Sequence, residues 1–265
     1  MPSLLWFMAC WLSGRASRAL GGGVLLAFGL SPALAATPVT LQLKWTHNFQ
    51  FAGYYAALEK GYYREAGLEV RLKEAQPGLD VPAQVVSGQA DFGVGTSSLL
   101  LHRHAGRPVV VVATIFQHSP AAFIARRESA TQSIHDLAGR RVMIEPGMDE
   151  LTAYLRREGL ADDALRVVEH SFDPRDLING KVDAMSAYLS YEPYFLDREG
   201  FDYQIFTPRS MGIDFYGDNL FTSEALLKSR PELVKAFREA SVRGWEYAIA
   251  YPGEIAALIR DRYAP

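Results

Sequence analysis

Strand-like and helix-like segments alternate along most of this chain, and this alternation constrains its fold more than any other feature. The predicted strands are 40–45, 68–73, 91–95, 109–115, 122–125, 141–144, 165–168, 183–188 and 203–207. The predicted helices between them are 52–66, 81–86, 96–104, 149–158, 174–178 and 192–198. Repeated alternation with short connections predicts an α/β fold with largely parallel sheets. The continuous apolar run 109–115 is typical of a strand that is buried on both faces of a parallel sheet.

The pattern changes after residue 222, where helices follow one another without intervening strands. We predict helices at 223–228, 231–251 and 252–263. Ser223 is a good N-cap, and Pro231 and Pro252 each stand at a favourable first helical position. The last part of the chain is therefore expected to be entirely helical.

The composition fits a folded protein that does not bind nucleic acid. Of the 265 residues, 49% are hydrophobic and 22% are charged, so the chain can bury a substantial core. The formal net charge is -3, and no stripe of lysine and arginine is present to track a phosphate backbone.

The first 35 residues have the features of a secretory signal peptide. Arg15 and Arg18 precede an apolar stretch, and Ala33-Leu34-Ala35 forms a small-x-small cleavage site. We expect the mature chain to begin near Ala36 in the periplasm, although an uncleaved membrane anchor is an alternative. Cys10 is the only cysteine, so a chain cleaved after residue 35 would contain neither a disulfide nor a thiolate metal site.

Several segments carry a resemblance to a known family. They are LKWTHNFQFAGYYAA at 43–57, EKGYYREAGLEV at 59–70, GQADFGVG at 88–95, DLAGRRV at 136–142 and GKVDA at 180–184. Together they resemble the periplasmic solute-binding proteins for thiamine-pyrimidine precursors, with alkanesulfonate and nitrate binders as relatives. Segments 116–120, 185–188 and 212–220 further resemble the periplasmic sensor modules of histidine kinases and diguanylate cyclases.

The resemblance implies a periplasmic binding protein type II fold, with two lobes joined by two crossovers. Residues 38–121 and 214–265 would form lobe one, and residues 122–213 would form lobe two. A small-molecule ligand would bind between the lobes, at the carboxyl ends of the strands, and would favour closure of the cleft. The implied partner is an ABC permease or a membrane-bound signalling output domain, and the protein would be a monomer unless it belongs to a receptor dimer.

Candidate ligand-binding residues follow the predicted strands. Trp45 offers a flat face for stacking, and His47 can hydrogen-bond a ring nitrogen or a phosphate. In the resembling proteins, the position of Glu192 holds a carboxylate that binds the aminopyrimidine. The full candidate set is Trp45, His47, Phe49, Tyr54, Gly95, Thr96, Ser97, Gln117, His118, Glu145, Tyr188, Glu192, Asp214 and Tyr216.

Each of these candidates also has a purely structural interpretation. Trp45 can belong to a lobe core, and Thr96 and Ser97 can be ordinary helix caps instead of presenting the N–H groups of a helix start to a ligand. Gln117 and His118 can be solvated residues at a hinge.

The charge of the candidate loops favours one class of ligand. They contain Glu145, Asp149, Glu150, Glu192, Asp214 and Asp218, whereas Lys44 is the only basic residue nearby. A sulfonate or nitrate site would require arginine, lysine or many N–H donors. The loops instead favour a ligand with donor groups or positive charge, such as an aminopyrimidine.

The sequence gives no indication of catalysis. HExxH, Walker and nucleophile-elbow motifs are absent, and His102 and His104 are two residues apart, so they do not share a helix face. We therefore expect a binding protein without a metal or cofactor. The alternative is an enzyme like the yeast thiamine-pyrimidine synthases, which share the fold, but those carry a cysteine-rich iron motif that this sequence lacks.

Overall fold

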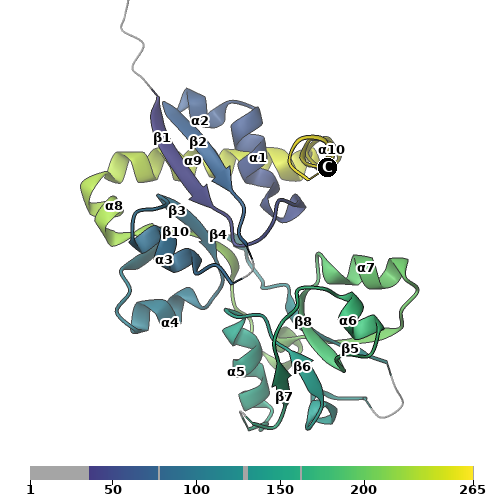
Figure 1. Ribbon diagram of the computed structural model, residues 1–265. Helices are drawn as coiled ribbons and strands as arrows, with labels where there is room; N and C mark the ends of the chain where they lie inside the picture. The colour runs from purple at the N-terminus through teal and green to yellow at the C-terminus, as the bar shows by residue number, and fades with distance from the viewer. Residues whose placement is uncertain (1–35, 77, 128–130, 162, 265) are drawn as a thin grey trace, which may run out of the picture. The chain divides into compact units, whose positions relative to one another are not determined.

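The computed structural model describes residues 36–76, 78–127, 131–161 and 163–264 (Figure 1). The predicted signal peptide, residues 1–35, lies outside the described residues. No described helix is long and apolar enough to cross a membrane.

The first sheet has five strands in the order β2-β1-β3-β10-β4. Its strands are β1 (Thr37–Gln42), β2 (Leu68–Lys73), β3 (Phe92–Gly95), β4 (Val109–Phe116) and β10 (Gly217–Ser223). β1 pairs in parallel with β2 and β3, whereas β10 lies antiparallel between β3 and β4.

The second sheet also has five strands, in the order β7-β6-β8-β5-β9. Its strands are β5 (Ala121–Arg126), β6 (Arg141–Met143), β7 (Arg166–Val168), β8 (Ala184–Tyr188) and β9 (Tyr203–Phe206). β6 pairs in parallel with β7 and β8, and β5 is antiparallel to β8 and β9.

The predicted α/β class with largely parallel sheets is confirmed. In each sheet one strand, β10 or β5, runs antiparallel to both of its neighbours, and the other four strands all run in one direction. The prediction that residues 109–115 are buried on both faces is wrong. Among the described strands β4 lies at the edge of its sheet, paired with β10, and the Val111 side chain is 46% exposed. An apolar run alone does not distinguish the centre of a sheet from its edge.

The helices lie between and after these strands. They are α1 (Ala52–Glu59), α2 (Tyr62–Glu65), α3 (Val81–Val86), α4 (Leu99–His104), α5 (Asp149–Arg157), α6 (Arg175–Ile178), α7 (Glu192–Arg198), α8 (Glu224–Ser229), α9 (Pro231–Ala250) and α10 (Pro252–Arg262), with 3₁₀ turns η1 (Phe49–Phe51), η2 (Ile134–Leu137) and η3 (Pro208–Met211). The predicted helical end of the chain is confirmed, and Ser223 Oγ accepts a hydrogen bond from Leu226 N at 3.2 Å as the N-cap of α8.

Two helices differ from their predicted bounds. The predicted helix 52–66 divides into α1 and α2 because Gly61 adopts a left-handed conformation with φ of 79°. The predicted helix 96–104 begins only at Leu99. The Thr96 hydroxyl accepts a hydrogen bond from Ser98 N at 3.2 Å, which stabilises a turn in place of the first helical residues.

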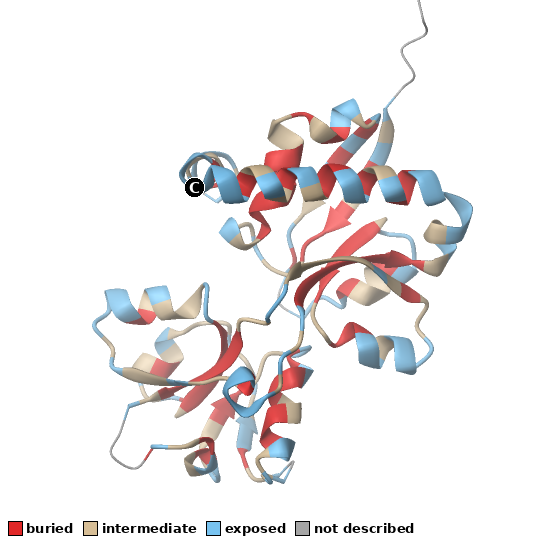
Figure 2. Cartoon of the chain, turned by 180° about the vertical axis from the view of Figure 1, so that it is seen from behind, coloured by how far each residue is buried: buried red, intermediate tan, exposed pale blue. Residues whose placement is uncertain are grey.

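The core of the first sheet is covered by α1 and α9, which pack closely together. Figure 2 shows buried residues in the central strands and along one face of α9. Gly53 of α1 and Gly244 of α9 permit the close approach, because a Cβ atom added at Gly244 would lie 2.2 Å from the Gly53 carbonyl oxygen. Separate apolar clusters, one around Phe123 and Leu151 and another around Ile124, lie against the second sheet.

The first sheet takes its strands from residues 37–116 and 217–223, and the second from residues 121–206. The chain passes between the sheets at 117–120 and again at 207–216. This connectivity agrees with the predicted pair of crossovers. The boundaries proposed for the two lobes stay a prediction.

Candidate functional site

A cavity of about 320 Å³ lies where loops from both sheets meet. It is lined by Lys44 and Trp45 after β1, by residues 78–82, by the β3–α4 loop, by residues 145–148 after β6, and by Phe172. Most of these segments follow the carboxyl ends of strands, where open α/β sheets bind their ligands. We call this the first cavity.

Aromatic rings form one part of the wall of the first cavity. The centroids of the Trp45 and Phe172 rings are 5.2 Å apart. Phe172 has a φ of 60°, which is unusual for a residue with a side chain and marks a constrained turn. His170 packs against Phe172, and burial lowers the pKa of His170 to about 4, so its ring is neutral at pH 7.

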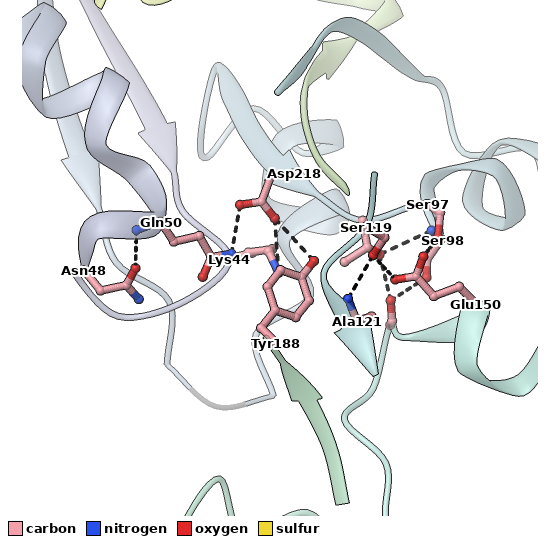
Figure 3. A network of polar contacts seen from close by, with 12 residues as sticks. Lys44, Asn48, Gln50, Ser97, Ser98, Ser119, Ala121, Glu150, Tyr188 and Asp218 are labelled. Carbon is pink, nitrogen blue, oxygen red and sulfur yellow. Dashed lines mark hydrogen bonds and ion pairs between the residues drawn. The ribbon is translucent and has the colours of Figure 1, made fainter. Parts of the chain in front are cut away.

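A buried polar network surrounds Lys44, the residue before Trp45 in the chain (Figure 3). Lys44 Nζ is 3.4 Å from Asp218 Oδ1 and 3.7 Å from the centroid of the Tyr188 ring. Asp218 is 1% exposed, and its Oδ2 accepts a hydrogen bond from Gln50 Nε2 at 2.8 Å. The Tyr188 hydroxyl donates to Asp218 Oδ1 at 3.4 Å. The network therefore joins the segment after β1, the turn η1 and strand β10 to β8 of the second sheet.

The charges of this network are strongly coupled. Burial alone would lower the pKa of Lys44, but Asp218, Tyr188 and Glu145 together raise it well above its ordinary value. Burial raises the pKa of Glu145, and Lys44 opposes that rise. Burial likewise raises the pKa of Glu192 to about 7, although its carboxylate accepts a hydrogen bond from Tyr188 N at 2.7 Å. At neutral pH Lys44 is therefore protonated, and several carboxyl groups lie around it.

The β3–α4 loop contacts the β6–α5 loop through hydroxyl groups. Thr96 Oγ1 and Ser98 Oγ both donate to the carbonyl oxygen of Gly147, at 2.7 and 2.6 Å. α4 starts at Leu99, three residues after Thr96, and the Thr96 and Ser98 hydroxyl groups serve a contact between loops. That backbone N–H groups of the 93–98 junction face a ligand stays a prediction.

Glu150 of α5 forms a second contact between these regions. Its side chain is buried and accepts hydrogen bonds from Ser119 Oγ at 2.7 Å and from Ser97 Oγ at 3.5 Å (Figure 3). Burial raises the pKa of Glu150, and the Ser119 hydroxyl is the largest influence that opposes the rise.

The structure brings some of the predicted site residues together. The first cavity is lined by Trp45, Gly95, Thr96 and Glu145. Tyr188 and Glu192 belong to the adjoining polar network. Ser97 and Tyr216, with Thr96 again, line a second cavity of about 570 Å³ between α4, β4 and Phe215.

The other predicted residues lie elsewhere. His47 Nδ1 hydrogen-bonds the Tyr55 hydroxyl at 2.5 Å, and Phe49 is 44% exposed. Tyr54 is fully buried in the core, edge-on to the ring of Trp245.

Three of the predicted residues lie at the connections between the sheets. Gln117 is exposed and donates to Thr114 O, and His118 Nδ1 is 2.8 Å from Asp214 Oδ2. These positions suit the hinge interpretation better than direct ligand contact.

Three residues outside the candidate set also shape the site. Lys44 is the basic residue nearest the candidate loops, but lysine is usually solvated, so the sequence alone does not indicate that it is buried. Asp218 is one of several acidic residues in those loops, and the sequence does not distinguish it from the others. Phe172 lies in a segment without a recognisable motif, and no signal in the sequence identifies it.

The geometry agrees with comparisons to known proteins. A family model described as "NMT1/THI5 like" matches residues 48–255. The chain belongs to this family.

Named relatives of this chain include both binding proteins and enzymes. Riboflavin-binding protein RibY of Chloroflexus aurantiacus is 32% identical over 224 residues, covering 82% of this chain and 64% of RibY. A formylaminopyrimidine-binding protein of Halalkalibacterium halodurans is 26% identical, with 82% and 68% covered. A 4-amino-5-hydroxymethyl-2-methylpyrimidine phosphate synthase of Legionella pneumophila is also 26% identical, with 83% and 72% covered.

Solved structures support the same fold. A protein from Bordetella bronchiseptica superposes with a TM-score of 0.71 at 20% identity, covering 83% of this chain and 75% of that one. The periplasmic aliphatic sulphonate binding protein SsuA of Escherichia coli gives 0.66 at 14% identity, with 85% and 78% covered. The chain therefore has the periplasmic binding protein fold, as predicted.

Proposed function

We propose that this protein binds a flat nitrogen heterocycle, such as an aminopyrimidine, in the first cavity. It would do so in the periplasm and would present the bound form to an ABC permease or to a membrane-bound output domain. The observation that carries the proposal is the combination, in one cavity, of Trp45 and Phe172 with the hydrogen-bonding groups of Lys44 and Glu145. Small-molecule sites usually pair apolar and aromatic walls with a few polar groups in this way.

The chemistry of the cavity favours such a ring over a small anion. Lys44 is the only lysine or arginine among the described residues that line the cavity, and the buried carboxylate of Asp218 already neutralises it. Two of the relatives are named for binding riboflavin and a formylaminopyrimidine, and each of these ligands contains a pyrimidine ring. Ligand contacts to loops of both sheets would favour a closed arrangement of the cleft.

Calorimetric titration tests the proposal. We expect 4-amino-5-hydroxymethyl-2-methylpyrimidine, formylaminopyrimidine or riboflavin to bind, and methanesulfonate not to bind. Trp45→Ala should weaken binding at least about 10-fold, because the ring loses its stacking partner. Tyr194→Ala removes an exposed aromatic ring of α7 that lines neither cavity, and it should leave binding unchanged. Failure of all three rings to bind, or equal binding by Trp45→Ala, would contradict the proposal.

The second candidate function is pyrimidine phosphate synthesis, because several relatives are named for that activity. Mass spectrometry of the purified protein tests it, since a synthase would yield the pyrimidine phosphate and a binding protein would not. The described residues contain no group of three or more His, Cys, Asp and Glu side chains placed to hold a metal ion. The sequence has one cysteine, Cys10, and so offers no cysteine-rich iron motif. We therefore favour the binding role.

A further inference from the structure

Lysine side chains are usually exposed, but the side chain of Lys44 is largely buried. It follows β1 by two residues, its side chain is 13% exposed, and it lines the first cavity next to Trp45. Removing an ammonium group from water is costly unless other groups compensate. Its burial therefore requires an explanation.

The surrounding structure holds the ammonium group in one place. Asp218 lies on one side of it and the face of the Tyr188 ring on another, an arrangement that combines an ion pair with a cation–π contact. Asp218 is itself fixed by Gln50 and has a φ of 47°. Residues with a side chain rarely adopt this left-handed conformation, and such backbone strain clusters at functional sites.

Lys44 can donate more hydrogen bonds than its observed partners account for. An ammonium group has three N–H donors, and among the described residues Asp218 and the Tyr188 ring contact it closely. Lys44 and Glu145 both line the first cavity, so a ligand bound there can meet a side chain that donates and a side chain that accepts.

We propose that Lys44 is the specificity-determining residue of this site and donates a hydrogen bond to an acceptor atom on the edge of an uncharged pyrimidine ring. Glu145 accepts from the donor next to that atom on the ring. This assignment rests on the proposed function and deepens it. The ring can be a free aminopyrimidine, with a ring nitrogen beside an amino group, or the pyrimidinedione of a flavin, with a carbonyl beside an N–H.

The experiment compares ligands with and without the acceptor. The probes are 4-amino-2-methylpyrimidine and 3-methylaniline, which keeps the amino and methyl groups but has C–H in place of both ring nitrogens. Binding of riboflavin is measured as a separate test. The wild-type protein should prefer the pyrimidine over the aniline by about 10- to 100-fold, as expected for a hydrogen bond from a charged donor.

The decisive variant is Lys44→Met/Asp218→Asn, which removes both charges and leaves no unpaired carboxylate at position 218. It should lose the preference for the pyrimidine, should bind riboflavin more weakly, or both. If the preference for the pyrimidine is lost, the site recognises a free aminopyrimidine. If the affinity for riboflavin falls, it recognises the pyrimidinedione of a flavin. Lys235→Met, an exposed lysine on α9, is the matched control and should change neither.

The outcomes separate this inference from the proposed function. If the wild-type protein binds neither ring, the proposed function is wrong. If it binds and the double variant keeps both affinities, only the role of Lys44 is overturned. Should the double variant fail to fold, Lys44→Arg keeps the charge beside Asp218 but replaces the compact ammonium with a planar guanidinium, and it must also reduce the preference.

Discussion

Replacing Gly244 with alanine should destabilise the protein, although alanine is normally the better helix former. Gly244 lies in the middle of α9, where its backbone faces α1. An added Cβ atom would lie 2.2 Å from the carbonyl oxygen of Gly53, and 2.6 Å from the Cβ and 2.8 Å from the N of Ala57. Two of these atoms belong to the α1 backbone, which no change of side-chain rotamer can move. The two helices would have to separate.

The size of the effect follows from two opposing contributions. Overpacking a tight contact costs about 1–3 kcal/mol, and a clash with backbone belongs at the upper end of this range. Alanine recovers about 1 kcal/mol of helix propensity relative to glycine. The net loss is therefore about 2 kcal/mol, which corresponds to a fall in Tm of about 4–8 °C for a chain of this size.

Thermal unfolding followed by circular dichroism measures this effect. Gly253→Ala is the matched control, because Gly253 also lies in a helix but has no atom within 4 Å of an added Cβ. It should leave Tm unchanged or raise it slightly. If Gly244→Ala were as stable as Gly253→Ala, the close approach of α1 and α9 would be incorrect.

Two further predictions concern carboxyl groups near the site. Because the pKa of Glu192 rises from 4.5 to about 7 on folding, the folded state binds more protons than the unfolded state between these pH values. The unfolding free energy should therefore fall by up to about 3 kcal/mol as pH rises from 5 to 8, and Glu192→Gln should flatten that dependence in urea titrations. Ser119→Ala removes the 2.7 Å hydrogen bond to the buried carboxyl of Glu150 and should cost about 1–3 kcal/mol at pH 8. The cost should be smaller at pH 5, where Glu150 can take up a proton, and an equal loss at both values would contradict this account.

Helices and strands that are bounded by glycine or by a capping residue could be predicted from the sequence. The bounds of β2 and α3 agree with their predictions to the residue, because glycine or a capping aspartate marks each start and the apolar spacing is clear between them. Asp80 Oδ1, for example, accepts a hydrogen bond from Ala83 N as the N-cap of α3. Pairing between distant segments has no such signal.

β10 shows this limit most clearly. Its sequence, GDNLFTS, begins with three residues that are typical of loops, yet all seven residues are buried between β3 and β4. Burial there results from tertiary contacts, which override local propensity. The same reasoning applies to the site. The resemblance led to Trp45, but only the folded chain brings Phe172 and Asp218 to it.

The position of β10 also determines when the first sheet can be completed. β3 and β4 do not pair with each other, and the strand that joins them follows β4 by about a hundred residues. A nascent chain that has emerged only as far as β9 therefore has all of its second sheet but exposes two unpaired strand edges in its first. The sheet whose first four strands are synthesised first is thus completed last, and its open strand edges can favour aggregation until β10 has emerged.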